Sequence, residues 1–160
     1  MGSAMLSELL ALTLAFSVQK SPPADAHSDE ARLNACLAQA EFAESCIGAV
    51  SNACQEDPGG YTTYGMMECE RRENELWDQR LNAAYSRMRE MMLEREMTTR
   101  RDALLAAQRL WLQYRDAECE QRGLAYEGGT MRGVVHNSCF SGFTARRALE
   151  LESQLQELSR

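Results

Sequence analysis

The sequence predicts an all-α fold: a small disulfide-stapled helical bundle made of an antiparallel helical hairpin, a third long helix and a short N-terminal helical section. Apolar residues recur every three or four positions through most of the 160-residue chain, which is the period of a helix with one buried stripe. Six cysteines form an even set. We find no stretch in which apolar and polar residues alternate as in a half-buried strand.

Residues 1–26 have the pattern of a signal peptide. An apolar run from Leu6 to Val18 is interrupted by Glu8, and the segment ends in A-D-A, which offers small residues at both positions that a signal peptidase inspects. The run is too short to span a bilayer. We therefore predict one domain, residues 27–160, that is periplasmic or secreted and has no integral membrane segment after processing.

The cysteines support this location. An exported chain of this size is expected to use six cysteines in disulfides, and the residues alone leave fifteen pairings open. A zinc site is the alternative, but no C-x-x-C motif occurs and the only histidines are His27 and His136. We therefore expect neither a metal nor another cofactor.

The N-terminal section is predicted to be helical and short. Residues 29–43 form one helix, in which Leu33, Leu37 and Ala40 share a face, and residues 45–53 add one or two turns before D-P-G-G ends them. Neither piece is stable alone.

The hairpin consists of two long helices on either side of a turn at residues 94–101, with Thr98 or Thr99 as the N-cap of the second helix. Cys69 and Cys119 then lie at the same end of the hairpin. The predicted buried positions are Trp77, Leu81, Tyr85, Met88 and Met92 in the first helix and Leu104, Ala107, Trp111 and Tyr114 in the second.

Glycine-rich breaks flank the hairpin. Residues 58–65 read P-G-G-Y-T-T-Y-G, after which Thr62 or Thr63 caps the first long helix. Residues 123–133 form the second break, and Thr130 there caps the third long helix. That helix has apolar residues at positions Ala148, Leu151, Leu155 and Leu158, and it is expected to complete a three-helix core.

Five polar residues lie beside the apolar stripes: Asp78, Asn82, Gln108, Arg115 and Asp116. One interpretation makes Asp78 and Asp116 a carboxylate pair for acid/base chemistry. The interpretation we favour is a structural polar network that ties the helices in register. Because the chain also lacks G-x-S-x-G, H-E-x-x-H and a glycine loop between a strand and a helix, we expect no catalytic residues and no enzyme.

The charge favours a protein partner. The chain has 17 basic and 24 acidic residues, a net charge of −7. Such an acidic surface is unsuited to nucleic acid, whose phosphates require a basic surface, and it favours encounter with a basic protein.

The patterns C-x3-E-N-E-L-W-D-x2-L-N-x2-Y and Q-R-x-W-L-x-Y-R-D-A-E-C, with a later cysteine ahead of an arginine-rich helix, resemble the lysozyme inhibitor LprI-like N-terminal domain family over about residues 54–155. The matching residues are Cys69, Asp78, Leu81, Asn82, Tyr85, Gln108, Trp111, Arg115, Asp116, Cys119 and Cys139. The resemblance implies an exported, helical, disulfide-bonded protein. It further implies the pairs Cys54–Cys69 and Cys119–Cys139, and with them Cys36–Cys46, with Cys69–Cys119 as the main alternative.

The resemblance also implies a protein that inhibits lysozyme and so protects peptidoglycan. A structural or accessory envelope protein that binds another protein or a cell-wall component, without lysozyme inhibition, is the alternative. The loops expected to contact a partner carry exposed tyrosines beside glycines. The predicted contact residues are Tyr61, Thr63, Tyr64, Tyr126 and Glu127.

Overall fold

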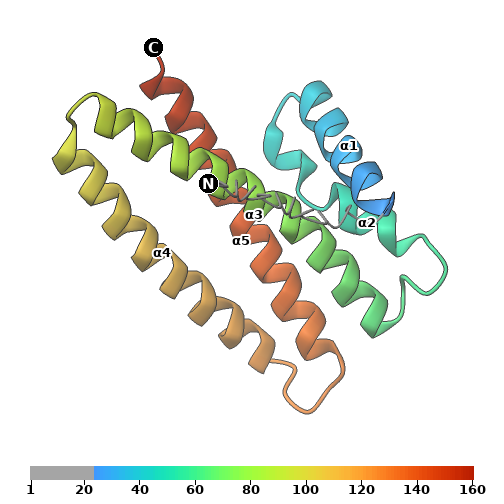
Figure 1. Cartoon of the computed structure of the whole chain (residues 1–160). Coiled ribbons are helices and arrows are strands. Elements are labelled where there is room, and N and C mark those ends of the chain that lie inside the picture. The colour runs from blue at the N-terminus through green and yellow to red at the C-terminus, as the bar shows by residue number, and fades with distance from the viewer. Residues whose placement is uncertain (1–23) are drawn as a thin grey trace, which may run out of the picture.

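The computed structural model describes residues 24–160, with side chains from Ser28 onward. The predicted signal segment lies almost entirely outside the described residues and stays a prediction. The described chain is helical, without a strand, as the sequence predicts (Figure 1). None of its helices is long and apolar enough to cross a membrane. The elements are α1 (Ala24–Gln39), the 3-10 helix η1 (Ala43–Cys46), α2 (Ala49–Gln55), α3 (Thr63–Glu94), α4 (Thr98–Leu124) and α5 (Met131–Leu158).

Helix α3 begins at a threonine cap. Thr62 stands just before the helix in an extended conformation, and its Oγ1 accepts a hydrogen bond from the backbone N–H of Gly65 at 2.9 Å. This bond satisfies one of the N–H groups that the first helical turn leaves free. Of the two predicted caps, Thr62 is therefore the correct one.

The caps of α4 and α5 differ from the prediction. The N-cap of α4 is Met97, and no side chain caps it, so the prediction of Thr98 or Thr99 is wrong. The reason is that Glu96 reverses the chain with a φ of 57°, which leaves Thr98 already inside the helix. Thr130 does occupy the N-cap position of α5, but its side chain makes no capping hydrogen bond.

Helix α5 lies between the two arms of the hairpin. It packs extensively against α3 and less extensively against α4, whereas α3 and α4 make few contacts with each other (Figure 1). Because α3 and α5 are both antiparallel to α4, they run in the same direction and begin at the same end of the bundle. The predicted hairpin with a third long helix is therefore confirmed, and the third helix is its centre.

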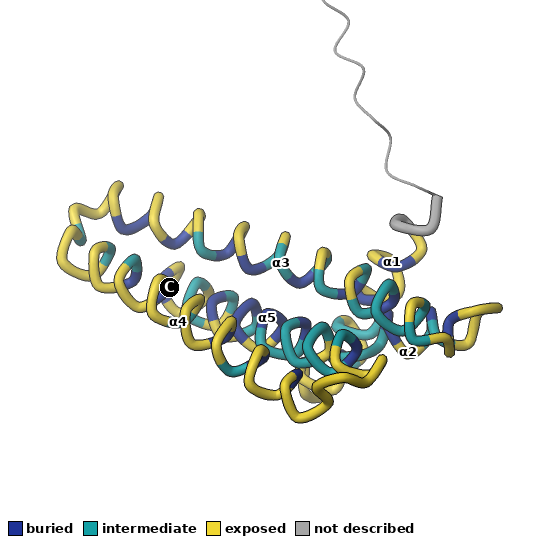
Figure 2. The backbone as a smooth tube through the Cα atoms, turned by 90° about the horizontal axis from the view of Figure 1, so that it is seen from below, coloured by how far each residue is buried: buried dark blue, intermediate teal, exposed yellow. Residues whose placement is uncertain are grey.

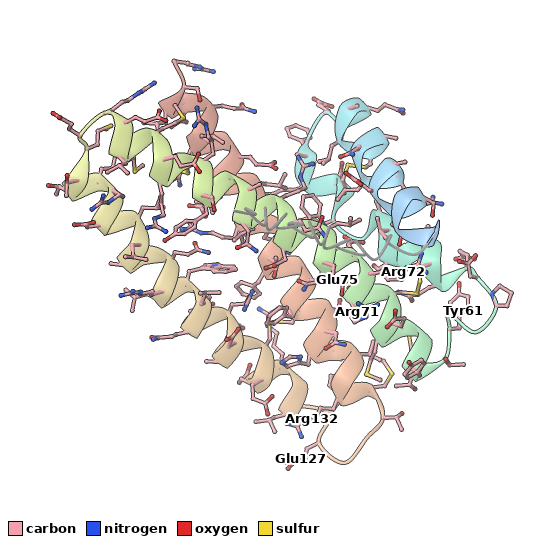
Figure 3. All side chains as sticks on the ribbon, viewed as in Figure 1. Tyr61, Arg71, Arg72, Glu75, Glu127 and Arg132 are labelled. Atoms are coloured by element: carbon pink, nitrogen blue, oxygen red, sulfur yellow. A yellow bond between two sulfur atoms is a disulfide. The ribbon has the colours of Figure 1, made fainter. Side chains whose placement is uncertain are left out.

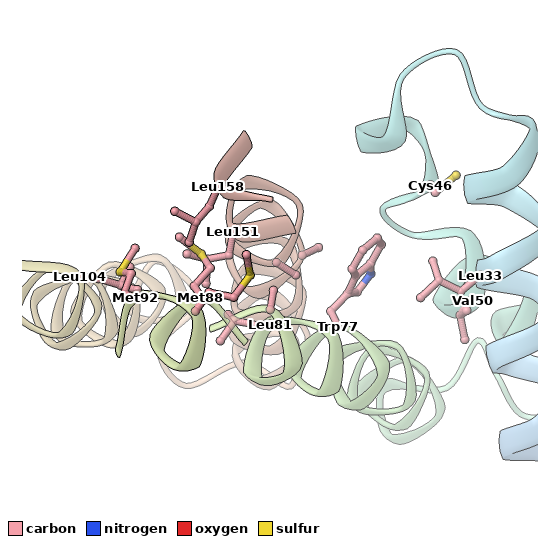
Figure 4. Close-up of a cluster of buried hydrophobic side chains, with 14 residues drawn as sticks. Leu33, Cys46, Val50, Trp77, Leu81, Met88, Met92, Leu104, Leu151 and Leu158 are labelled. Atoms are coloured by element: carbon pink, nitrogen blue, oxygen red, sulfur yellow. The ribbon is translucent and has the colours of Figure 1, made fainter. Parts of the chain in front are cut away.

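The core is built mainly from α3 and α5. Trp77 is fully buried, and α4 contributes Leu104. Figure 4 shows this cluster, with Leu33 and Val50 of the N-terminal section beside Trp77. Its labelled members are Leu33, Cys46, Val50, Trp77, Leu81, Met88, Met92, Leu104, Leu151 and Leu158.

Helix α4 turns a different face inward from the one predicted. Leu104 is buried and Trp111 is half-buried, as expected, but Ala107 is exposed and Tyr114 is 56% exposed. The exposed side of α4 is visible along the outside of the bundle in Figure 2. The side chains that α4 turns inward are Leu104, Gln108, Trp111, Arg115, Cys119 and Gly123. Two of these are strongly polar, so apolar periodicity alone could not identify this face.

All six cysteines are paired. The disulfides are Cys36–Cys46, Cys54–Cys69 and Cys119–Cys139. These are the pairs that the family resemblance implied, and the alternative Cys69–Cys119 is not formed. The first bond closes the N-terminal section, and the other two close the glycine-rich breaks on either side of the hairpin.

Candidate functional site

The two loops predicted for partner contact lie at one end of the bundle. Residues 56–62 lead into α3, and residues 125–130 join α4 to α5. The first turns of α3 and α5 are in contact, because a Cβ added to Gly133 would lie 2.5 Å from the Sδ atom of Met67. Figure 3 shows Tyr61 and Glu127 on this end of the molecule.

The first loop is held rigidly. Gly59 has a φ of 87°, a conformation that favours glycine, and a Cβ on Gly65 would collide with the Gly59 carbonyl oxygen. The Thr62 hydroxyl donates a hydrogen bond to that same oxygen at 2.8 Å. The Cys54–Cys69 disulfide closes the loop. A loop fixed in this way loses little conformational entropy when it binds a partner.

The predicted contact residues are mostly exposed. Tyr64 is 76% exposed, Tyr61 66% and Tyr126 49%, whereas Thr63, the first residue of α3, is half-buried. The Tyr61 hydroxyl donates a hydrogen bond to the Glu56 carboxylate at 2.9 Å, and this bond raises the pKa of Tyr61.

Both loops are acidic. Glu56 and Asp57 lie in the first loop and Glu127 in the second; all three are exposed, and neither loop contains a basic residue. Glu127 takes part in no ion pair among the described residues. The two loops therefore combine aromatic side chains with negative charge, which suits a basic protein surface, while the exposed arginines of the adjoining turns, Arg122 and Arg132, are paired with Glu118 and Glu120.

The five predicted network residues do not form one network. On α3, Asn82 donates a hydrogen bond to Asp78 at 2.8 Å. No hydrogen bond within residues 28–160 joins this pair to Gln108 or Arg115. The reason is that Gln108 and Arg115 direct their hydrogen bonds to α5, and a groove separates them from Asp78 and Asn82.

The polar contacts of α4 connect it to α5. Gln108 is 94% buried and accepts a hydrogen bond from Arg147 Nε at 3.0 Å. Arg115 donates to the Thr144 hydroxyl at 3.4 Å and pairs with Asp116 at 2.9 Å. These contacts fix the register of α4 on α5. Asp116 is thereby engaged on α4 and Asp78 on α3, and no contact joins the two as a catalytic pair.

A narrow groove remains between α3 and α4, with a volume of about 190 Å³. Its walls combine aromatic, aliphatic, amide and charged groups, and Gln108 and Arg115 within it are both nearly buried. Most of the residues that carry the family resemblance lie here. The lining residues from that set are Asp78, Leu81, Asn82, Tyr85, Gln108, Trp111 and Arg115.

The sequence analysis missed a buried carboxylate, Glu73, which is 0% exposed. Its oxygens accept hydrogen bonds from Gly48 N at 2.5 Å, Ser51 N at 2.7 Å, Val50 N at 3.0 Å and Trp77 Nε1 at 3.0 Å. A side chain of α3 thus caps the N-terminus of α2, which has no side-chain cap of its own. The sequence feature that could have revealed Glu73 is its position four residues before the buried Trp77, in E-N-E-L-W.

A second contact joins the N-terminal section to α3. Arg72 pairs with Asp29 at 2.7 Å, and Asp29 is only 6% exposed. Together with the Cys54–Cys69 disulfide and Glu73, this ion pair attaches α1 and α2 to the side of α3 that is remote from α4 (Figure 1). The loop in front of α3 is therefore supported from both of its ends.

Comparison with known proteins agrees with this architecture. The chain is 27% identical over 123 residues to an uncharacterized protein of Rhizobium meliloti (strain 1021), covering 69% of this chain and 88% of that protein. No solved structure matches it significantly. The model of the family described as lysozyme inhibitor LprI matches residues 54–151, which include α3, α4 and most of α5. The chain therefore belongs to the LprI family.

Proposed function

We propose that the protein is an exported inhibitor of lysozyme that places the two acidic loops against the basic rim of the enzyme's cleft. The observation that carries this proposal is a group of three exposed tyrosines at one end of the bundle, Tyr61 and Tyr126 on the two disulfide-closed loops and Tyr64 in the first turn of α3. Membership of a family described as lysozyme inhibitors supports it. The family is not one of enzymes, which agrees with a binding role.

The physical basis is preorganisation together with charge. The disulfides and the glycine contacts hold the loops before binding, so that little ordering is required at the interface. Tyr61 and Tyr64 offer large amphipathic side chains of the type that dominates binding energy at interfaces. Glu56, Asp57 and Glu127 would steer a basic enzyme toward them.

The test is inhibition of a panel of lysozymes by oxidised protein obtained from full-length expression. We expect inhibition at physiological ionic strength, and an inhibition constant raised at least about tenfold by Tyr61→Ala or Tyr64→Ala, as for a tyrosine at the centre of an interface. Phe42→Ala is the matched control, because Phe42 is also aromatic and 69% exposed but lies outside both loops. Absence of inhibition at micromolar protein would contradict the proposal.

The groove between α3 and α4 supports the second candidate, an accessory envelope protein that binds a cell-wall component. Aromatic rings beside amide, carboxylate and guanidinium groups can hold a sugar ring, because its C–H face packs on apolar surface while its hydroxyls need donors and acceptors. Arg109→Ala, which alters the groove but neither loop, distinguishes the candidates. Binding of soluble cell-wall fragments that Arg109→Ala abolishes, with no lysozyme inhibition, favours the second.

A further inference from the structure

The outward face of α4 carries an uninterrupted row of uncharged side chains. Leu110 is 66% exposed, and the alanines around it are exposed as well. Tyr114 is 56% exposed; it borders α5, where its ring meets the Phe143 ring edge-on with centroids 5.6 Å apart. The outward side of a surface helix is normally charged, so a helix whose apolar residues face solvent is unusual. The members of this row, the α4 outer face, are Ala103, Ala106, Ala107, Leu110, Tyr114 and Ala117.

The spacing of the α4 outer face is that of a helix-packing seam. Ala103, Ala107, Leu110, Tyr114 and Ala117 follow one another at intervals of four, three, four and three residues, which is the heptad spacing of residues that meet a second helix. Large and small side chains occur together in the row. A large residue on one helix can therefore fit over an alanine on another.

We propose that the α4 outer face binds the same face of a second copy of this chain in an antiparallel, two-fold symmetric pair. Leu110 lies next to the midpoint of α4, which spans Thr98–Leu124. A two-fold axis at Leu110 sets Ala103 level with Ala117 of the second copy and Tyr114 level with Ala106. Alanines then face alanines near the ends, and the part of the Tyr114 ring that Phe143 leaves exposed faces a small residue.

The charges beside the α4 outer face favour this orientation. Arg100 and Glu118 are eighteen residues apart, or about five helical turns, and therefore lie on the same flank of α4. An antiparallel two-fold pairing joins equal flanks, so Arg100 of one copy meets Glu118 of the other. Among the described residues Arg100 forms no ion pair within its own chain. Glu118 accepts from Arg122 at 2.8 Å and has lone pairs for a second donor.

The opposite flank is electrostatically neutral. Asp102 and Glu120 are also eighteen residues apart and would approach each other in the pair. Each is neutralised within its own chain, Asp102 by Arg101 and Glu120 by Arg132. The Arg100–Glu118 contact therefore determines the electrostatic preference for the antiparallel pair.

The α4 outer face is separate from the proposed lysozyme contact. It runs along the side of the bundle that is remote from α1 and α2, whereas the two loops lie at one end (Figure 1). Figure 2 shows exposed positions recurring along α4. Pairing through α4 thus leaves the loops accessible, and it does not depend on the proposed function.

The first test is sedimentation equilibrium of the oxidised protein from full-length expression, between about 1 μM and about 1 mM, a range that brackets the dissociation constants of small interfaces. We expect a monomer–dimer equilibrium. Leu110→Glu should weaken the dimer at least about tenfold, because it places two like charges at the two-fold axis. Leu93→Glu is the matched control, since Leu93 is 63% exposed on α3, and it should leave the dimer unchanged.

The second test determines the orientation. Arg100→Glu should weaken the dimer about two- to fivefold, as expected for an exposed ion pair, and adding Glu118→Arg should restore it. A protein that stays monomeric at the highest concentration overturns the proposal, as does a dimer that Leu110→Glu leaves intact. A double charge exchange that fails to restore the dimer overturns the antiparallel pairing. Circular dichroism verifies that each variant is folded.

Discussion

Helix α5 contacts α3 and α4 on different sides and through different chemistry. Against α3 it packs apolar side chains, among them Leu151 beside Met88, around the fully buried Trp77. Against α4 it uses the hydrogen bonds of Gln108 and Arg115, the Cys119–Cys139 disulfide, and the Arg115 guanidinium, which lies 3.7 Å from the centre of the Phe140 ring. The α3 side is a hydrophobic core, and the α4 side is a polar seam closed by a covalent bond.

The difference explains why α4 can expose an apolar face. Apolar burial is not directional and stabilises in proportion to area, so it draws the most apolar side of a helix inward. Hydrogen bonds to Arg147 and Thr144 depend on direction, and they orient α4 by its polar side instead. Apolar positions such as Leu110 are consequently left outside, where a second helix can use them, although Leu104 and Trp111 still face inward.

The largest expected effect is a difference in stability between variants of the two tryptophans. Trp77→Ala should lower the free energy of unfolding by about 3–5 kcal/mol, because it empties a fully buried site and removes a hydrogen bond to Glu73. Trp111→Ala should cost only about 1–2 kcal/mol, because Trp111 is half-buried and packs under the Arg115 guanidinium. Guanidinium denaturation of the oxidised variants measures both. Equal losses would show that the two sides of α5 contribute alike.

The next effect compares the buried polar groups of the two sides. Glu73→Gln should lower the free energy of unfolding by about 2–4 kcal/mol. The amide NH2 group would replace a carboxylate oxygen that accepts hydrogen bonds from two N–H groups, so that donors would face donors. Gln108→Leu should cost about 1 kcal/mol, because Arg147 keeps Glu150 as a partner. Hydrogen exchange at the Val50 and Ser51 amides should accelerate only in the Glu73 variant. Protected amides there would contradict the capping role of Glu73.

The same contrast determines what the sequence could predict. On α3 the apolar period gave the correct buried face, including Trp77 and Leu81, because packing there is apolar. On α4 the period named Ala107 and Tyr114, which are exposed, because polar partners on α5 decide the orientation. Such partners become visible only when α5 is placed beside α4.

The candidate site follows the same division. The glycine-rich loops and their exposed tyrosines are local features, and the turn residues reveal them. Glu73 was missed because its partners at residues 48–51 lie more than twenty positions away in the sequence. The groove between α3 and α4 was missed because it depends on how far α5 separates the two arms of the hairpin.

The smallest expected effect is a pH dependence on the α3 side. Burial raises the pKa of Glu70, and the nearby Glu73 carboxylate raises it further. Hydrogen bonds from Ser138 and Ser51 lower this pKa by less, so the net shift is upward. The folded chain thus holds this proton more tightly than the unfolded chain, so the free energy of unfolding should fall as pH rises from about 4.3, the ordinary glutamate value, through the raised pKa. Glu70→Gln should remove this fall. The free energy of unfolding of the Glu70→Gln variant, relative to that of the unmodified chain, should therefore increase from pH 4 to pH 7, about the range over which such a carboxyl titrates. Exposed Glu157→Gln is the control, and parallel stability curves for the unmodified and Glu70→Gln proteins would exclude a native-state penalty at Glu70.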